Sequence, residues 1–276
     1  MSPVMAIART EARLGIRNSW VLLSTVILTV FAVLLVLLGS GATGEVDASL
    51  LAVSIASLST LSVYLVPLIA LLLAFDAIAG EIDRGTLQLV LASPVSRGAV
   101  LVGKFMGHVA VLAIAVSFGY GIAGLVAFFA NGAGEAVALL GVGRLIASST
   151  ILGATFIAIG YIASASVRQT GTAAALAIAI WLFAVVLYDL ALLGGLLASQ
   201  DGFFAREVFP WLLVFNPADA FRLYNMSPID ALAVGSNLGG SGSALPLSGL
   251  ATMLSPVAWT ALALGLSTFI LKRVRP

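Results

Sequence analysis

The chain has 276 residues, of which 61% are hydrophobic and only 9% are charged, and its formal net charge is +1. Soluble domains average about 45–50% apolar and about 25% charged residues, so this composition excludes an ordinary soluble protein. With no Cys, the chain offers neither a disulfide nor a thiolate metal site. The apolar runs are long and continuous and do not alternate, so we predict an all-α polytopic membrane protein, not a β-barrel.

Six apolar runs are long enough to cross a bilayer, which takes about 20 helical residues. The first run is longer than the hydrophobic region of a signal peptide, so we expect it to stay attached. We predict a single transmembrane domain over residues 1–276 with six transmembrane helices. The spans cover about 20–38, 50–79, 102–130, 138–164, 172–197 and 249–271.

The Lys and Arg residues gather on one side of these spans. If the N-terminus is cytoplasmic, that side carries ten of them, and the other side keeps only Arg144, Arg206 and Arg222. Positive residues favour the cytoplasmic side of a membrane. We therefore predict a multi-pass protein of the inner (plasma) membrane with both termini cytoplasmic. The ten residues are Arg9, Arg13, Arg17, Arg84, Arg97, Lys104, Arg168, Lys272, Arg273 and Arg275.

The residues before the first span predict an interfacial helix. Three Arg residues recur every four positions and share one helical face, with apolar residues near the other face. This pattern is typical of a helix on the inner leaflet, facing anionic membrane lipid. A plain topology signal would explain the charges equally well. The basic face holds Arg9, Arg13 and Arg17, and the apolar face holds Val4, Ile7 and Leu14.

The connection between the second and third spans, residues 80–104, is longer than a simple turn needs. Residues 83–85 interrupt the apolar pattern, and residues 86–92 could form a short amphipathic helix. Ser93 followed by Pro94 predicts the start of the helix that leads into the third span. Connections between helices usually take about two to eight residues. The segment is therefore either a docking surface or an inert interfacial loop.

The same segment contains a partial nucleotide motif. Gly98, Gly103 and Lys104 fit the start of a phosphate-binding loop, but Phe105 stands where a Ser or Thr should bind magnesium. The chain also continues directly into an apolar run. We expect this chain to bind no nucleotide, and nothing in it suggests nucleic-acid binding.

About fifty residues separate the fifth and sixth spans. A capping residue followed by Pro and, two residues later, an acid occurs there twice, at 216–219 and at 227–230. Each is a helix-start signal, with the acid complementing the helix dipole. We predict short extracytoplasmic helices that either cap the bundle or receive a partner.

Several polar residues lie at membrane depth, where such groups are costly and usually face the bundle interior. Arg144 and Asp189 lie at matching depths near the outer ends of spans four and five, and we predict an ion pair between them. Near the inner boundary, Asp76, Lys104 and His108 lie within a few turns of one another. We interpret His108 as a hydrogen-bonded helix residue more readily than as a ligand.

Gly103 and Gly107 form a GxxxG pair in the third span. Small residues at this spacing let a neighbouring helix approach closely. A single match is weak evidence for such a contact.

The segment from Glu81 to Lys104, with Arg84-Gly85-Thr86-Leu87 and Leu91 to Arg97, resembles the loop after the second span in type-2 ABC transporter permeases. That resemblance implies a cytoplasmic coupling helix that sits in a groove of a separate ATPase subunit. ATP and Mg would then be bound by the partner, and this chain would carry no cofactor and no catalytic residue. The ATPase-coupling residues so implied are Glu81, Asp83, Arg84, Gly85, Thr86, Leu87, Pro94 and Arg97.

Two further stretches, FDAIAGE (75–81) and NPADAFRLYNM (216–226), are similar to a branch of this family that serves the maturation of copper-containing nitrous oxide reductase. Because six spans enclose little of a pathway and one coupling segment serves one ATPase, we expect a homodimer that binds two copies of the ABC ATPase subunit. If the system handles copper, we expect a periplasmic copper-handling protein to hold the ion. The residues expected to contact that outer partner are Asn216, Pro217, Asp219, Arg222 and Met226.

A copper path through the bilayer would need clustered soft ligands such as Cys, Met and His. The chain has no Cys, one His and five Met, and apart from Met1 and Met5, which precede the first span, no two Met are spaced i,i+3 or i,i+4. We therefore expect no metal site here and a mechanical role instead. An export permease for a lipid, drug or peptide, and a secondary transporter, stay open as alternatives.

Overall fold

The computed structural model describes residues 2–39, 50–86, 95–130, 136–199, 202–233 and 249–273. Within these ranges the chain forms helices and no strand, which confirms the predicted fold class. Six of the described helical runs are long and apolar enough to cross a membrane, as predicted. They are Ser19–Leu38, Ser54–Asp83, Arg97–Phe129, Leu140–Ser166, Thr170–Ala198 and Leu250–Arg273.

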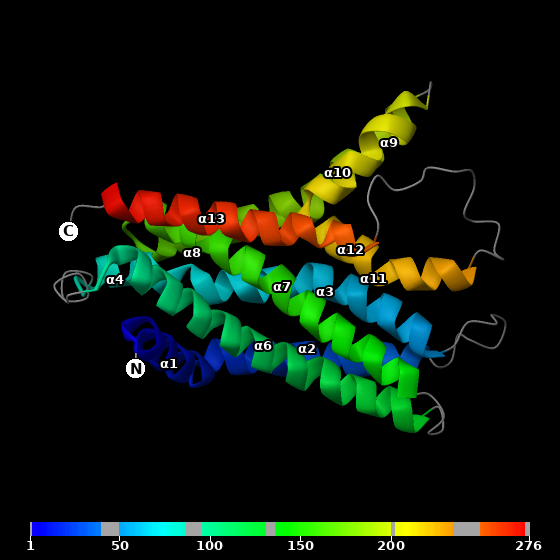
Figure 1. The fold of residues 1–276 in the computed structure, drawn as a ribbon, viewed down its shortest axis with the longest axis horizontal. Coiled ribbons are helices and arrows are strands. Elements are labelled where there is room, and N and C mark those ends of the chain that lie inside the picture. The colour runs from blue at the N-terminus through cyan, green and yellow to red at the C-terminus, as the bar shows by residue number, and fades with distance from the viewer. Residues whose placement is uncertain are drawn as a thin grey trace.

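The long helices run side by side, and both termini lie at the same end of the bundle as α4 (Figure 1). The fifth run is composite, because a π-helix, η2, separates α8 from α9. Beyond it, α9 and α10 (Phe209–Phe215) lean away from the other helices (Figure 1). The bounds are α2 Ser19–Gly39, α3 Leu50–Ala74, α4 Asp76–Asp83, α6 Arg97–Ala130, α7 Ala136–Ser166, α8 Thr170–Trp181, η2 Leu182–Leu187, α9 Tyr188–Ala198 and α13 Leu254–Arg273.

The second, third and fourth spans form the interior of the bundle. In the most apolar 18 residues of each of these spans, 56%, 44% and 61% are buried inside the chain, against 22%, 17% and 22% for the first, fifth and sixth spans. Tyr120 and Ser149 both bond to the Ser62 hydroxyl, at 2.6 and 3.3 Å, and so link α6 and α7 to α3. The first, fifth and sixth spans therefore lie at the periphery of the bundle and keep large exposed apolar faces.

The N-terminal helix α1 (Pro3–Ile16) packs along α6. A Cβ atom on Gly103 would lie 2.8 Å from Ile7 Cβ, and one on Gly107 would lie 2.8 Å from the Ala8 carbonyl oxygen. Only glycine admits so close an approach, so the GxxxG prediction is confirmed, with α1 as the neighbour. The three Arg residues of the predicted basic face are exposed, while Leu14, predicted on the apolar face, is also 62% exposed. The placement of α1 in a lipid interface stays a prediction.

The helix that leads into the third span begins at Arg97, three residues after the predicted start at Pro94. Ser96 caps it, because its hydroxyl accepts the Ala99 N–H at 3.2 Å. Ser93, Pro94 and the expected amphipathic helix beyond Thr86 lie outside the described residues.

Two helices, α10 (Phe209–Phe215) and α11 (Pro217–Ala233), lie between the fifth and sixth spans, preceded by the π-helix η3 (Phe204–Val208). The predicted start at Asn216 is confirmed, since its Oδ1 accepts the Ala218 N–H at 2.9 Å. The second predicted start is wrong: α11 continues through Pro228. Proline has no N–H for the carbonyl four residues earlier, on Tyr224. The Arg144 guanidinium donates to that carbonyl instead.

Candidate functional site

The candidate site lies at the end of the bundle that holds α1 and α4, called the inner end because it is predicted to be cytoplasmic, and here α4 ends in an exposed turn. Gly85 has φ +69°, its N–H donates to the Ile82 carbonyl, and the Thr86 N–H donates to the Glu81 carbonyl. This is a Schellman motif, in which a left-handed residue closes the helix and satisfies its last carbonyls. The turn formed by residues 83–85 therefore has a defined conformation and is open to solvent.

Lys104 joins α4 to α1 and α6. Its ammonium lies 2.5 Å from Glu11 Oε1 and 2.7 Å from Glu81 Oε1, with only 7% of its side chain exposed. A buried cation is tolerated when it is paired and hydrogen-bonded. The two carboxylates meet this need, and the ammonium fixes the relative positions of three helices.

Glu11 also faces the single histidine. His108 Nε2 lies 3.6 Å from Glu11 Oε2, and His108 Nδ1 lies 2.9 Å from the Tyr161 hydroxyl. Burial alone would raise the pKa of Glu11, but the hydrogen bond from His108 and the charge of Lys104 together lower that pKa to about 2. The interpretation of His108 as a hydrogen-bonded helix residue is confirmed.

Two more contacts fasten α4 to its neighbours. The Ser164 hydroxyl, on α7, accepts the N–H groups of Ile78 and Ala79 at 2.9 Å and donates to the Phe75 carbonyl at 2.6 Å. Asp83 Oδ2 accepts the backbone N–H of Thr170 at 3.3 Å and its hydroxyl at 2.9 Å, which caps the start of α8. The turn is thus connected to α1, α6, α7 and α8.

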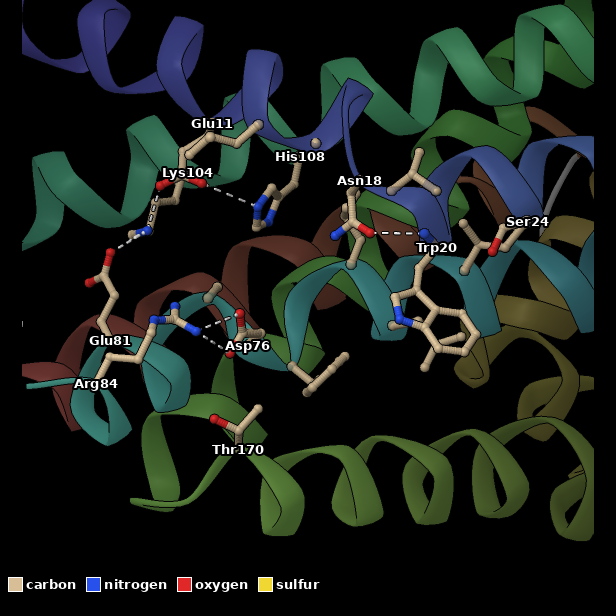
Figure 2. A pocket seen from close by; sticks show the side chains of 18 residues that line it. Glu11, Asn18, Trp20, Ser24, Asp76, Glu81, Arg84, Lys104, His108 and Thr170 are labelled. Carbon is tan, nitrogen blue, oxygen red and sulfur yellow. Dashed lines mark hydrogen bonds and ion pairs between the residues drawn. The ribbon is translucent and has the colours of Figure 1, made fainter. Parts of the chain in front are cut away.

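Asp76 and Arg84 form an ion pair along α4, with 3.3 Å between Oδ2 and Nη1. The pair passes over Gly80, where a Cβ atom would lie 2.9 Å from Arg84 Nη2. Together with Lys104 and His108, these side chains line a cavity of about 480 Å³ (Figure 2). The predicted proximity of Asp76, Lys104 and His108 is confirmed.

At the outer end, the predicted pair of Arg144 and Asp189 is wrong. Asp189 Oδ2 lies 3.0 Å from the Arg222 guanidinium, while Arg144 donates to the Tyr224 carbonyl and lies over the Tyr224 ring. Matching depths on adjacent spans suggested a direct pair, but α11 supplies the partners of both side chains, Tyr224 for Arg144 and Arg222 for Asp189. Arg222 also holds Asp219, with 2.9 Å between Nη1 and Oδ1.

Three residues predicted to contact an outer partner are buried inside the chain. Asn216 donates its amide to the Ala184 carbonyl at 2.8 Å, Pro217 is covered, and Asp219 has only 1% of its side chain exposed. The Ala184 carbonyl is free to accept because η2 shifts the Tyr188 N–H to the Phe183 carbonyl. These three therefore hold the corner between α10 and α11. Contact of the half-buried Arg222 and Met226 with a partner stays a prediction.

Comparison with known proteins decides the family. Residues 5–275 match the model described as ABC-2 family transporter protein. The chain belongs to the ABC-2 transporter family. It is 40% identical over 274 residues to "Probable ABC transporter permease protein NosY" of Stutzerimonas stutzeri, and 41% identical over 274 residues to a protein of the same name in Pseudomonas aeruginosa. Each alignment covers 99% of both proteins.

The chain is thus a multi-pass ABC transporter permease similar to NosY, and such permease subunits are not themselves enzymes. Of the predicted ATPase-coupling residues, Asp83, Arg84 and Gly85 form the exposed turn. Glu81 and Arg97 turn inward instead. Glu81 pairs with Lys104, and Arg97 donates to the Leu271 carbonyl at 2.6 Å. Thr86 follows the turn, whereas Leu87 and Pro94 lie outside the described residues.

Sequence reasoning missed Glu11 and Ser164 as parts of this site. For Glu11 the sequence did contain a signal, namely Lys104, because a Lys within an apolar span requires a buried acid nearby. The sequence does not say which acid supplies it, since Glu11 is far away along the chain. Ser164 gave no signal, because Ser residues in membrane helices commonly bond to their own helix.

Proposed function

We propose that this permease passes the motion of a separate ABC ATPase to the outer side of the membrane during copper-site maturation of nitrous oxide reductase. The ATPase docks on the turn at residues 83–85 and the segment that follows it. Two copies of the chain bind two copies of the ATPase. The inner end of the bundle is cytoplasmic, and a periplasmic copper-handling protein receives the motion outside. The NosY-like relatives support this branch of the family.

The observation that carries the proposal is that one helix, α7, contacts α4 near one end of the bundle and α11 near the other. Near its inner end, α7 holds the first turn of α4 through Ser164. Near its outer end, it holds α11 through Arg144 and through Ser148, whose hydroxyl bonds to the Asn225 amide at 3.1 Å. Arg144 and Ser164 are 20 residues apart, which in an α-helix is about 30 Å. A displacement of α4 is therefore carried by α7 to α11.

The metal chemistry is assigned to the partner. Among the described residues, no three His, Cys, Asp or Glu side chains are grouped so as to hold a metal ion. Copper carriage by a periplasmic protein is compatible with this arrangement, and the chain's contribution is mechanical. The copper content of nitrous oxide reductase from cells that lack the chain tests this part. An unchanged copper content would contradict it.

Docking is tested by cross-linking, because the chain has no Cys and an introduced Cys is its single thiol. Arg84→Cys places the thiol on the exposed turn, and Arg13→Cys places it on an exposed face of α1 at the same end of the bundle. With a short thiol-to-amine cross-linker, we expect the ATPase subunit to be captured by Arg84→Cys and not by Arg13→Cys. Equal capture at both positions, or none in a complex that hydrolyses ATP, would refute docking at the turn.

A further inference from the structure

The cavity at the inner end has two chemically different halves. Figure 2 shows the charged side chains at one side and Trp20 and Ser24 at the other. The apolar part of the wall comes from α2 and α3 and includes Val21, Ile69 and Leu72. Its volume of about 480 Å³ lies within the range of about 300–1,000 Å³ that is typical of ligand pockets.

The polar half carries an excess of negative charge. Of the described residues that line it, Glu11, Asp76 and Glu81 are acidic, and Arg84 and Lys104 are basic. Two positive and three negative charges leave a net charge of −1 with His108 neutral. Lys104 is enclosed by its two carboxylates, whereas the pair of Asp76 and Arg84 is open, with 41% and 58% of the side chains exposed.

The open pair presents both signs of charge to an occupant. Arg84 offers guanidinium N–H groups, which match the oxygens of a phosphate. Asp76 and the acid excess offer oxygens, which accept from a primary ammonium. Asn18 lies nearby, and its Oδ1 already accepts the Trp20 N–H at 2.9 Å, so that bond leaves its amide N–H groups unused.

We infer that this cavity binds one phospholipid that carries a primary amine in its head group. The phosphate lies against Arg84, and the ammonium lies against Asp76 and the acid excess. The start of an acyl chain covers the apolar wall. The surrounding bilayer is the source of this ligand, because Trp20, which lines the cavity, is 69% exposed and lies in the first turn of a membrane span. Trp side chains favour the depth of lipid head groups.

A lipid in this position contacts α1, α2, α3 and α4 at once, so it helps to hold the exposed turn at residues 83–85 in place. Lipid binding at this site depends only on the cavity and its charges, and it does not depend on the proposed role in reductase maturation. Cargo transport is no part of it, because the ligand is a resident component.

The test is native mass spectrometry of the full chain, delipidated in detergent and titrated with phosphatidylethanolamine, phosphatidylcholine or phosphatidylglycerol of the same acyl chains. We expect one phosphatidylethanolamine to bind at least about tenfold more tightly than the other two, the size of one charge-assisted hydrogen bond. Asp76→Asn removes this preference, whereas Arg84→Gln weakens the binding of all three lipids by about the same factor, because all three carry the phosphate. The matched exposed variants Arg13→Gln and Glu207→Gln leave both unchanged.

A third variant separates the cavity from loosely bound surface lipid. Ser24→Phe fills the apolar half without changing any charge, so we expect it to abolish the single tight site for all three lipids. The thermal unfolding midpoint of each variant shows whether it is folded. Equal affinity for the three head groups, tighter binding of phosphatidylglycerol, or retention of the tight site in folded Ser24→Phe protein would each overturn the inference.

Discussion

At the scale of single residues, Lys104 shows how a buried charge in a membrane protein holds neighbouring helices together. Removing an ammonium from water is costly, and its attraction to carboxylates offsets that cost only when the geometry is close. Glu11 and Glu81 supply the contacts at 2.5 and 2.7 Å from two different helices. The residue that resembled a phosphate-loop lysine in the sequence therefore holds α1 and α4 against α6.

Replacing Lys104 with Met should destabilise the chain strongly. The substitution leaves two mostly buried carboxylates close together without a cation, and breaking a buried pair typically costs about 3–5 kcal/mol. Thermal unfolding in detergent measures this. Lys272→Met, which removes an exposed Lys near the end of α13, serves as the control and should change little. Adding Glu11→Gln and Glu81→Gln to Lys104→Met should restore part of the loss, and a further loss would contradict the pairing.

At the corner between α10 and α11, as at Lys104, two carboxylates share one cation, which here is the Arg222 guanidinium. Arg222 lies 2.9 Å from Asp219 and 3.0 Å from Asp189, and Asp219 Oδ2 has no hydrogen-bond partner among the described residues. Burial and the nearby charge of Asp189 raise the pKa of Asp219 to about 7, although Arg222 opposes this shift. The Tyr188 hydroxyl, which also lies near this group, donates to the Leu212 carbonyl.

This raised pKa predicts how the stability of the corner depends on pH. A carboxyl group whose pKa is higher in the folded state than its ordinary value of 3.8 stabilises the fold fully below pH 3.8. That contribution is lost as pH rises through about 7. Between pH 5 and pH 8 the unfolding midpoint should therefore fall, and the Asp219→Asn variant should fall less. An identical slope in both proteins would disprove the assignment. Glu11 acts in reverse, since its stabilisation is lost as pH falls from 4.5 toward 2.

At the scale of elements, local signals predicted the helices well and their contacts poorly. Apolar length predicted all six spans, because a bilayer imposes that length on any helix that crosses it. Pro228 looked like a helix start, yet α11 passes through it because Arg144 satisfies the carbonyl that the proline leaves free. The partners of Arg144 and Asp189 were mispredicted for a related reason. Depth in the membrane is encoded locally, whereas the position of α11 depends on the whole fold.

The turn after α4 depends on glycine at its C-terminal boundary. Gly85 has φ +69°, and a Cβ atom there would meet nothing within 4 Å, so the restriction is conformational and not steric crowding. Gly85→Ala should cost about 1–2 kcal/mol, the penalty of a left-handed residue, and Gly85→Asn should cost less. The readouts are the unfolding midpoint and the ATPase activity of the assembled complex.

Gly171→Ala is the matched control for this prediction. Gly171 lies in α8, its surroundings are also open, and its backbone is helical. Alanine is the better helix former, so this variant should be neutral or slightly more stable. If Gly85→Ala behaved in the same way, the Schellman turn would not be what defines the exposed segment.

At the scale of the whole molecule, the interior helices are the ones that can carry force. The fourth span is the most buried of the six within the described residues, and its helix α7 is continuous over 31 residues. Helices packed on many sides shift as rigid bodies between discrete arrangements more readily than they bend. The outer spans, with their apolar faces uncovered, are available to lipid and to a second copy of the chain.

The connection through α7 predicts that Ser164 is needed for motion and not for ATP hydrolysis. In Ser164→Ala, the N–H groups of Ile78 and Ala79 lose their bond to α7, so α4 moves without pulling that helix. Met226→Cys carries a fluorophore on α11, in a chain with no other thiol, and reports ATP-dependent change in the assembled complex. We expect Ser164→Ala to reduce this signal while hydrolysis continues. Among the described residues, the Ser166 hydroxyl bonds only to the Ile162 carbonyl within α7, so Ser166→Ala should keep the full signal. An equal reduction in both variants would refute this path.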